Sequence, residues 1–233
     1  MPSLNILSGG AAQGLVGSVA AKFKKQTGLD ITGEFGAVGA MANKLREGTP
    51  ADILILTSAL IATLVKENLA EAASVKDVGC VETALAVRDA DPLVSASDAT
   101  NLRAVFLAAD AIFVPDTRNS TAGIHIAKVL RELGIADEVA SRLKIYPNGA
   151  TAMRHMAESE AKRPIGCTQA TEIIATNGIK LSGALPKGCD LVTVYTAAVT
   201  RSAVHPGETQ ILIDLLTATD QAALRAQAGF LDP

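Results

Sequence analysis

Short loops of small, neutral residues follow several apolar segments of this chain. The first loop is Ser8-Gly9-Gly10-Ala11, directly after Leu4-Asn5-Ile6-Leu7. Apolar side chains then recur at helical spacing from Leu15 to Phe23. A strand, a glycine turn and a helix start predict free backbone N–H groups and a helix dipole that favour an anion. The same pattern also fits an ordinary strand-to-helix turn.

Five further loops of this kind follow predicted strands. Ligands of open parallel sheets bind beyond the carboxyl ends of the strands, so loops on that edge can bring several helix amides together. Several of the loops also offer Ser, Thr or Asn as a helix N-cap. The residues that we expect to bind a ligand are Ser8, Gly9, Gly10, Ala37, Val38, Thr57, Ser58, Asn119, Ser120, Thr121, Ala122, Ala150, Thr151, Thr168 and Gln169.

Motifs for nucleotide binding and for hydrolysis are absent from the sequence. Neither G-x-G-x-x-G nor G-x-x-x-x-G-K-[ST] occurs, and G-x-S-x-G is missing as well. A reaction that moves a proton next to a carboxylate would need a base, for which His125, Glu82 and Cys167 are candidates without a motif behind them. Glu34 and Glu172 are further acidic candidates, and Arg118 could clamp a carboxylate.

No metal site or cofactor is predicted. His155 and His205 are separated from each other and from any cluster of cysteines or acids. The three cysteines, Cys80, Cys167 and Cys189, lack ligand spacing, and we interpret them as free, buried thiols. Free thiols mildly favour a reducing compartment.

Composition excludes two classes of partner. The net charge is −3 with acids and bases scattered, so no basic stripe predicts binding to nucleic acid. No run of 18 apolar residues occurs, which argues against membrane insertion. The chain begins Met-Pro-Ser-Leu-Asn without a signal peptide, so as written we expect a cytoplasmic protein, or a periplasmic one whose leader was removed.

Strand-like and helix-like segments alternate along the whole chain, which predicts an α/β fold with parallel sheets. The expected strands are 4–7, 31–35, 53–56, 81–87, 111–114, 143–146, 165–168 and 192–199. The expected helices follow them, at residues up to 25, 40–46, 59–67, 122–133, 151–158, 170–176 and 208–228. The strands 81–87 and 192–199 are natural places for the chain to cross between two lobes.

The order of several motifs resembles the molybdate-type periplasmic solute-binding proteins along essentially the whole chain. The resemblance rests on the opening strand, glycine loop and helix, on Phe23-Lys-Lys-Gln-Thr-Gly28, Gly48-Thr-Pro-Ala-Asp-Ile53, Thr121-Ala-Gly-Ile-His-Ile-Ala-Lys128 and Ala228-Gly-Phe230. It implies a two-lobed, class II binding-protein fold with a ligand in the cleft. Lobe one would comprise 1–80 plus 200–233, and lobe two 81–199.

The resemblance also has departures that bear on the ligand. Molybdate binders hold the oxyanion partly with serine hydroxyls, and the matching positions are Gly10 and Val38. A tyrosine often supplied by the second lobe is replaced near Thr168 or Gln169. Because a buried dianion needs many hydrogen bonds, these losses favour an organic di- or tricarboxylate over molybdate.

Two functions therefore stay open. The first is a solute-binding protein that takes up a small anion and delivers it to an ABC permease, if the chain is exported. The second is a cytoplasmic isomerase of an unsaturated di- or tricarboxylic acid, because the divergent subgroup that this chain resembles includes aconitate isomerase.

Overall fold

The computed structural model describes residues 2–232, which divide into two compact units. Unit 1 contains the described residues up to Val81 and those from Thr193 on, and unit 2 is Glu82–Val192. The family resemblance predicts the boundaries at 80/81 and 199/200. The contacts place the second boundary seven residues earlier, so that nearly all of the 192–199 strand counts with unit 1.

Unit 1 is a sheet with helices on both sides. Its strands β1 (Ser3–Gly9), β2 (Asp30–Gly36), β3 (Ile53–Thr57) and β9 (Val192–Val199) lie in the order β2-β1-β3-β9. The first three are parallel, and β9 runs antiparallel to β3. The long strand β4 (Lys76–Arg88) starts in this unit next to β9 and continues into unit 2.

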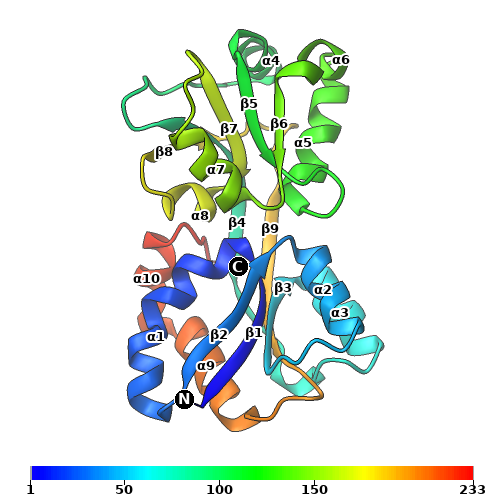
Figure 1. Ribbon diagram of the computed structural model, residues 1–233, viewed down its shortest axis with the longest axis vertical. Coiled ribbons are helices and arrows are strands. Elements are labelled where there is room, and N and C mark those ends of the chain that lie inside the picture. The colour runs from blue at the N-terminus through cyan, green and yellow to red at the C-terminus, as the bar shows by residue number, and fades with distance from the viewer. Residues whose placement is uncertain (1, 233) are drawn as a thin grey trace. The chain divides into compact units, whose positions relative to one another are not determined.

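The helices of unit 1 cover its sheet as their apolar faces require. On one side of the strands lie α1 (Gln13–Thr27), α9 (Pro206–Thr217) and α10 (Ala222–Gln227), and on the other side α2 (Val38–Arg46) and α3 (Ser58–Lys66) (Figure 1). Short 3-10 turns occupy Gly10–Ala12, Ala72–Ser74 and Thr219–Gln221. The run Ile53–Leu56 is fully buried, as expected of a strand covered on both faces.

Unit 2 repeats this architecture around a second sheet. Its order is β4-β7-β5-β6, with β5 (Ala111–Pro115) parallel to both β6 (Leu143–Tyr146) and β7 (Pro164–Gln169). Strand β4 is antiparallel to β7 and also to β8 (Ile179–Ala184). The helices are α4 (Ala99–Ala108), α5 (Thr121–Glu132), α6 (Ala136–Val139), α7 (Gly149–Ala157) and α8 (Ala170–Ile174), with a 3-10 turn at Ala140–Arg142.

Two helix groups cover the faces of the unit 2 sheet. In Figure 1, α7 and α8 lie on one side of the strands, and α5 and α6 on the other. The core on the α5 side includes Leu85 of β4, Phe106 of α4 and Ile126 of α5, all buried. Because successive side chains of a strand point to opposite faces, Thr83, two residues before Leu85 on β4, lies on this same face.

All the predicted strands and helices are present, with shifted ends. The structure adds α4, α6 and β8, for which no element is predicted, and β4 begins five residues earlier than expected. The helix α4 has a recognisable start, because the Asp98 side chain accepts a hydrogen bond from the Asn101 N–H at 2.8 Å.

No helix within residues 2–232 is long and apolar enough to cross a membrane. All three cysteines are free, with Cys167 and Cys189 buried and Cys80 partly buried.

The aspartate of the Gly48-Thr-Pro-Ala-Asp-Ile53 segment has a structural role in unit 1. Asp52 is buried, and its carboxylate accepts hydrogen bonds from the backbone N–H groups of Asn5 (2.8 Å), Val204 (2.6 Å) and His205 (3.0 Å). One side chain thus ties β1 and the start of α9 to β3, at the sheet edge opposite the glycine loops.

Replacing Asp52 with Asn should destabilise the chain by about 1–3 kcal/mol, because an amide nitrogen would face at least one buried N–H donor. Urea unfolding measures this loss. Asp98→Asn is the matched control and should be nearly neutral, since Asn caps a helix as well as Asp does. Equal stability of the two variants would contradict the structural role of Asp52.

Candidate functional site

The glycine loops of unit 1 lie together at one edge of its sheet. Parallel pairing sets Ser8 opposite Phe35 and Ile55, and Gly9 opposite Gly36. The strands β1, β2 and β3 therefore end side by side. We call residues 8–11, 36–38 and 57–58 the unit 1 edge.

Helices start at the unit 1 edge without side-chain caps. The N-cap residues Gly9, Ala37 and Thr57 form no side-chain cap hydrogen bond. Elsewhere α4 and α7 are capped by Asp98 and Asn148. The first N–H groups of a helix have no partner within the helix, so those at the unit 1 edge are available to an anion.

The side chains of this edge add few donors. The Ser8 hydroxyl is buried and donates to the carbonyl of Gly9 at 2.9 Å. Val38 is buried and packs next to Gly9, because a methyl group added there would lie 2.8 Å from Val38 Cγ1. Ser58 is exposed, and Thr57 is partly buried.

Tyr195 also belongs to this edge, and the sequence analysis missed it. It pairs with Thr57 through the β3–β9 register, and its Cε1 would lie 2.9 Å from a methyl group at Gly9. Its ring is buried and meets Phe230 edge-on, with the centroids 6.3 Å apart. The signal for Tyr195 is the sheet topology, which places the late strand β9 beside β3.

In unit 2 the parallel strands β5, β6 and β7 also end at one edge. The register sets Pro115 opposite Tyr146 and Phe113 opposite Gly166. We call residues 116–122, 147–151 and 168–170 the unit 2 edge. It contains the predicted ligand residues Asn119, Ser120, Thr121, Ala122, Ala150, Thr151, Thr168 and Gln169.

The loop before α5 is organised by Asp116. Its carboxylate accepts hydrogen bonds from the N–H groups of Arg118 (2.7 Å) and Asn119 (3.1 Å), and from the Asn119 side chain (3.0 Å). The Asn119 hydrogen bond, with the other donors, lowers the pKa of Asp116. The N-cap residue Ser120 makes no side-chain cap bond, so the first amides of α5 stay available.

The start of α7 is closed by side chains of the same unit. The Asn148 side chain accepts from the Thr151 N–H at 2.8 Å. The buried Glu172 carboxylate accepts from the backbone N–H groups of Gly149, Ala150 and Gln169, and from the Thr168 hydroxyl at 2.6 Å. The amides of Ala150 and Thr151 and the Thr168 hydroxyl therefore already have partners within the chain.

Burial raises the pKa of Glu172, and the four hydrogen bonds oppose that increase without cancelling it. The contact is tight, since a methyl group at Gly149 would lie 1.9 Å from Glu172 Oε2. Because its oxygens are engaged on several sides, Glu172 is a structural acceptor and offers no free lone pair to a substrate proton.

Gln169 and Thr83 are different, because their polar atoms are buried without a hydrogen-bond partner among residues 2–232. This applies to both polar atoms of the Gln169 carboxamide and to the Thr83 hydroxyl. Gln169 is 3% exposed and Thr83 1%. The two residues are directly paired across β7 and β4, so their side chains lie on the same face, the one covered by α5.

The three candidate bases have unequal environments. Cys167 is fully buried, which strongly raises the pKa of its thiol and keeps it protonated. His125 Nε2 lies 2.8 Å from the carbonyl oxygen of Cys189. Glu82 is partly buried next to Thr83 and forms no hydrogen bond or ion pair within the described part of the chain. Among residues 2–232, no group of three or more His, Cys, Asp or Glu side chains is placed to hold a metal ion.

A family model described as bacterial extracellular solute-binding protein matches residues 4–231. The chain belongs to this family. The match extends over both units, and it confirms the family that the motif order predicted.

This solute-binding protein has relatives of two kinds. It is 26% identical to an aconitate isomerase from a Pseudomonas species in an alignment 237 residues long, gaps included, which covers 97% of this chain and 87% of the isomerase. It is 23% identical to the molybdate-binding protein ModA of Escherichia coli, with 91% of this chain and 82% of ModA covered.

Solved structures support the predicted fold class. The periplasmic molybdate-binding protein of Azotobacter vinelandii matches with a TM-score of 0.80 at 19% identity, over 99% of this chain and 100% of that one. The sulfate-binding protein SubI of Mycobacterium tuberculosis matches with a TM-score of 0.73 at 16% identity, over 99% and 86%. The fold is therefore that of the two-lobed periplasmic binding proteins.

Substituting Gly9 by Ala in this solute-binding protein should cost about 1–3 kcal/mol, because the new methyl group would overlap Val38 and Tyr195. The backbone of Gly9, at φ −60° and ψ 143°, would itself accept Ala. Gly17→Ala, in an open position of α1, is the control and should stabilise by up to about 1 kcal/mol. Urea unfolding measures the stability of both variants, and an equal change in the free energy of unfolding would contradict the close packing at Gly9.

Replacing Glu172 by Gln should change how stability depends on pH. Since the folded pKa of Glu172 is raised, its stabilising contribution is fully present below the unfolded pKa and is lost as the pH rises through the folded pKa. The melting temperature of Glu172→Gln relative to the unsubstituted chain should therefore rise between about pH 4 and pH 8.

Glu160→Gln, at an exposed position, is the control for replacing a glutamate by glutamine outside the core. A constant difference for Glu172→Gln would contradict the raised pKa.

Proposed function

We propose that this solute-binding protein binds a small organic anion, a di- or tricarboxylate, in preference to molybdate. Each unit offers donors of its own. In unit 1 they are the uncapped helix amides of the unit 1 edge. In unit 2 they are the first amides of α5 and the Gln169 side chain. In transport, the partner that receives this anion would be an ABC permease, which requires the chain to be exported.

The observation that carries the choice of ligand is the unpartnered carboxamide of Gln169. Its oxygen is buried and can only accept a hydrogen bond, while its nitrogen can only donate. A fully ionised oxyanion such as molybdate offers no donor to that oxygen. An acid that carries a hydroxyl group, or that keeps one carboxyl proton when bound, offers both a donor and an acceptor.

The side chains of the unit 1 edge support the same choice. The positions that match the serines of molybdate binders are Gly10 and Val38, and the Val38 side chain packs against Gly9. The Ser8 hydroxyl already donates to a backbone carbonyl. Tight binding of a compact dianion needs more hydrogen bonds than these residues supply.

Thermal shift with molybdate, tungstate, sulfate, citrate, and cis- and trans-aconitate tests the proposal. A ligand at about 100 times its Kd adds about 2.7 kcal/mol to the stability of the folded chain. We expect an increase in melting temperature with at least one organic acid and none with molybdate.

Gln169→Leu should remove most of the increase seen with the organic acid, because it deletes both polar atoms. Gln210→Leu on α9 is the matched control and should leave the increase unchanged. A shift with molybdate alone, or an unchanged shift in Gln169→Leu, would overturn the proposed ligand class.

A second candidate function is the isomerisation of an unsaturated di- or tricarboxylic acid. Two observations favour it, namely the aconitate isomerase relative and the partly buried Glu82 carboxylate without a partner in the described chain. Glu82 would remove a proton from the carbon next to a carboxylate and return it at the other end of the allylic system, which moves the double bond without a net change in atoms. Backbone amides would stabilise the negative charge that develops between the two steps.

NMR of cis- and trans-aconitate in D2O with the purified chain tests this second function. Interconversion with deuterium incorporation is the expected result, and Glu82→Gln should slow it by about 100-fold or more. Glu138→Gln, at an exposed position, should leave the rate unchanged. If the acids bind and their spectra stay constant, the isomerase function is wrong and the binding function stands.

A further inference from the structure

Unit 2 contains a cavity at the end of its strands opposite the unit 2 edge. Its volume is about 480 Å³, within the range of pockets that hold small organic ligands. One wall is the helix α4, which presents Ala104, Val105 and Ala108. The other walls are the segment 91–95, Val87 of β4, and the stretch 162–165 that leads into β7. Most of this lining is apolar.

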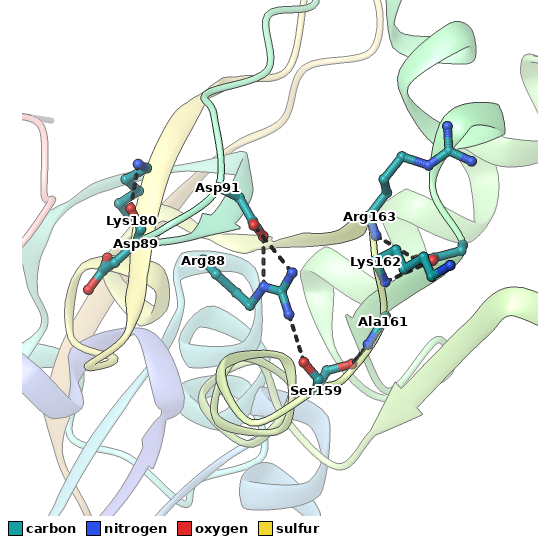
Figure 2. A network of polar contacts seen from close by, with 9 residues as sticks. Arg88, Asp89, Asp91, Ser159, Ala161, Lys162, Arg163 and Lys180 are labelled. Carbon is teal, nitrogen blue, oxygen red and sulfur yellow. Dashed lines mark hydrogen bonds and ion pairs between the residues drawn. The ribbon is translucent and has the colours of Figure 1, made fainter.

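The segment 91–95 is held open by bonds to its neighbours. Asp91 forms a two-point ion pair with Arg88, at 2.7 and 3.2 Å, and Arg88 also donates to the carbonyl of Ser159 at 2.7 Å (Figure 2). Val94 exchanges two hydrogen bonds of 2.7 Å with the Ser182 hydroxyl. These contacts form the wall of the cavity in advance, and they neutralise the Asp91 charge.

The opposite wall is fixed through the backbone of Lys162 and Arg163, and the positive charge of Arg163 also helps to lower the pKa of Asp110. The Asp110 carboxylate accepts from the backbone N–H groups of Lys162 (2.9 Å) and Arg163 (3.0 Å). Neither side chain forms a hydrogen bond or ion pair within residues 2–232, and both residues are exposed. In Figure 2 the Arg163 guanidinium extends away from the dashed contacts that fix its backbone.

We propose that this cavity binds a small amphipathic carboxylate, with its apolar part against α4 and its carboxylate at Lys162 and Arg163. The apolar lining fits a hydrocarbon or aromatic body, and the guanidinium and ammonium groups fit an anionic head. Asp91 is paired with Arg88, and the single Asp110 carboxylate faces the two cations Lys162 and Arg163, so the net charge at this rim is positive, which disfavours a cationic ligand.

This cavity is separate from the unit 2 edge. Val87 lies four positions after Thr83 on β4, and Ile165 lies four positions before Gln169 on β7. Four strand residues span about 13 Å, so one small acid cannot fill both places. The proposal does not depend on the identity of the anion bound at the strand edges.

Amide NMR of the full chain during titration with 4-phenylbutyrate tests the proposal. We expect the largest shift changes in the cavity walls, at the amides of residues 94–95, 101–109, 162, 163 and 165. The uncharged 4-phenylbutanol should bind at least about tenfold more weakly, because it lacks the carboxylate.

Two variants probe the two halves of the site. Ala108→Phe, on the exposed side of α4, should fill the cavity, and Lys162→Ala combined with Arg163→Ala should remove the cations. Each should lower the affinity for phenylbutyrate by about tenfold or more. Arg103→Ala, which lies outside the cavity lining, should leave this affinity unchanged. The melting temperature of each variant checks that it folds.

Three results would overturn the proposal. The first is the absence of chemical-shift changes in the cavity walls at about 10 mM phenylbutyrate. The second is equal affinity for the acid and the alcohol. The third is a set of shift changes confined to Thr121, Ala122 and Gln169. Retention of the cavity shifts in Gln169→Leu separates this site from the anion site of the strand edge.

Discussion

The buried carboxylate of Glu172 decides which backbone amides of unit 2 remain available to a ligand. A carboxylate in an apolar interior is costly unless hydrogen bonds compensate it, and here one hydroxyl and three N–H groups do so. The donors come from the start of α7 and the end of β7, which are thereby locked together. Within residues 2–232, the start of α5 has no side-chain cap from Ser120, so its first amides can serve a ligand.

Each unit contains a buried carboxylate that links elements of that same unit, and the two carboxylates lie at opposite edges of their sheets. Asp52 lies at the edge away from the glycine loops of unit 1, while Glu172 lies at the loop-bearing edge of unit 2. Asp52, the aspartate of the Gly48 to Ile53 motif, therefore has a structural role, away from the glycine loops. A helix start alone does not identify a ligand site, since α5 and α7 begin at the same edge with different partners.

The sequence predicted most of the fold because each apolar run and each helical spacing is local information. The unpredicted elements have weak local signals, since β8 carries a single strongly buried residue, Ile179, and α4 lies after a turn-rich segment. The candidate site was predicted as far as its loops. The contacts of Tyr195 with Gly9, and of Glu172 with Gly149, depend on long-range packing that no spacing encodes.

In unit 2, the amides already bonded to acceptors within the chain should not bind the ligand, and those at the start of α5 should. Amide NMR during titration with citrate or an aconitate tests this most directly. We expect large shifts for the N–H groups of Thr121 and Ala122, and small ones for those of Gly149 and Ala150. Large shifts at Gly149 and Ala150 would mean that the ligand displaces Glu172, and they would contradict this expectation.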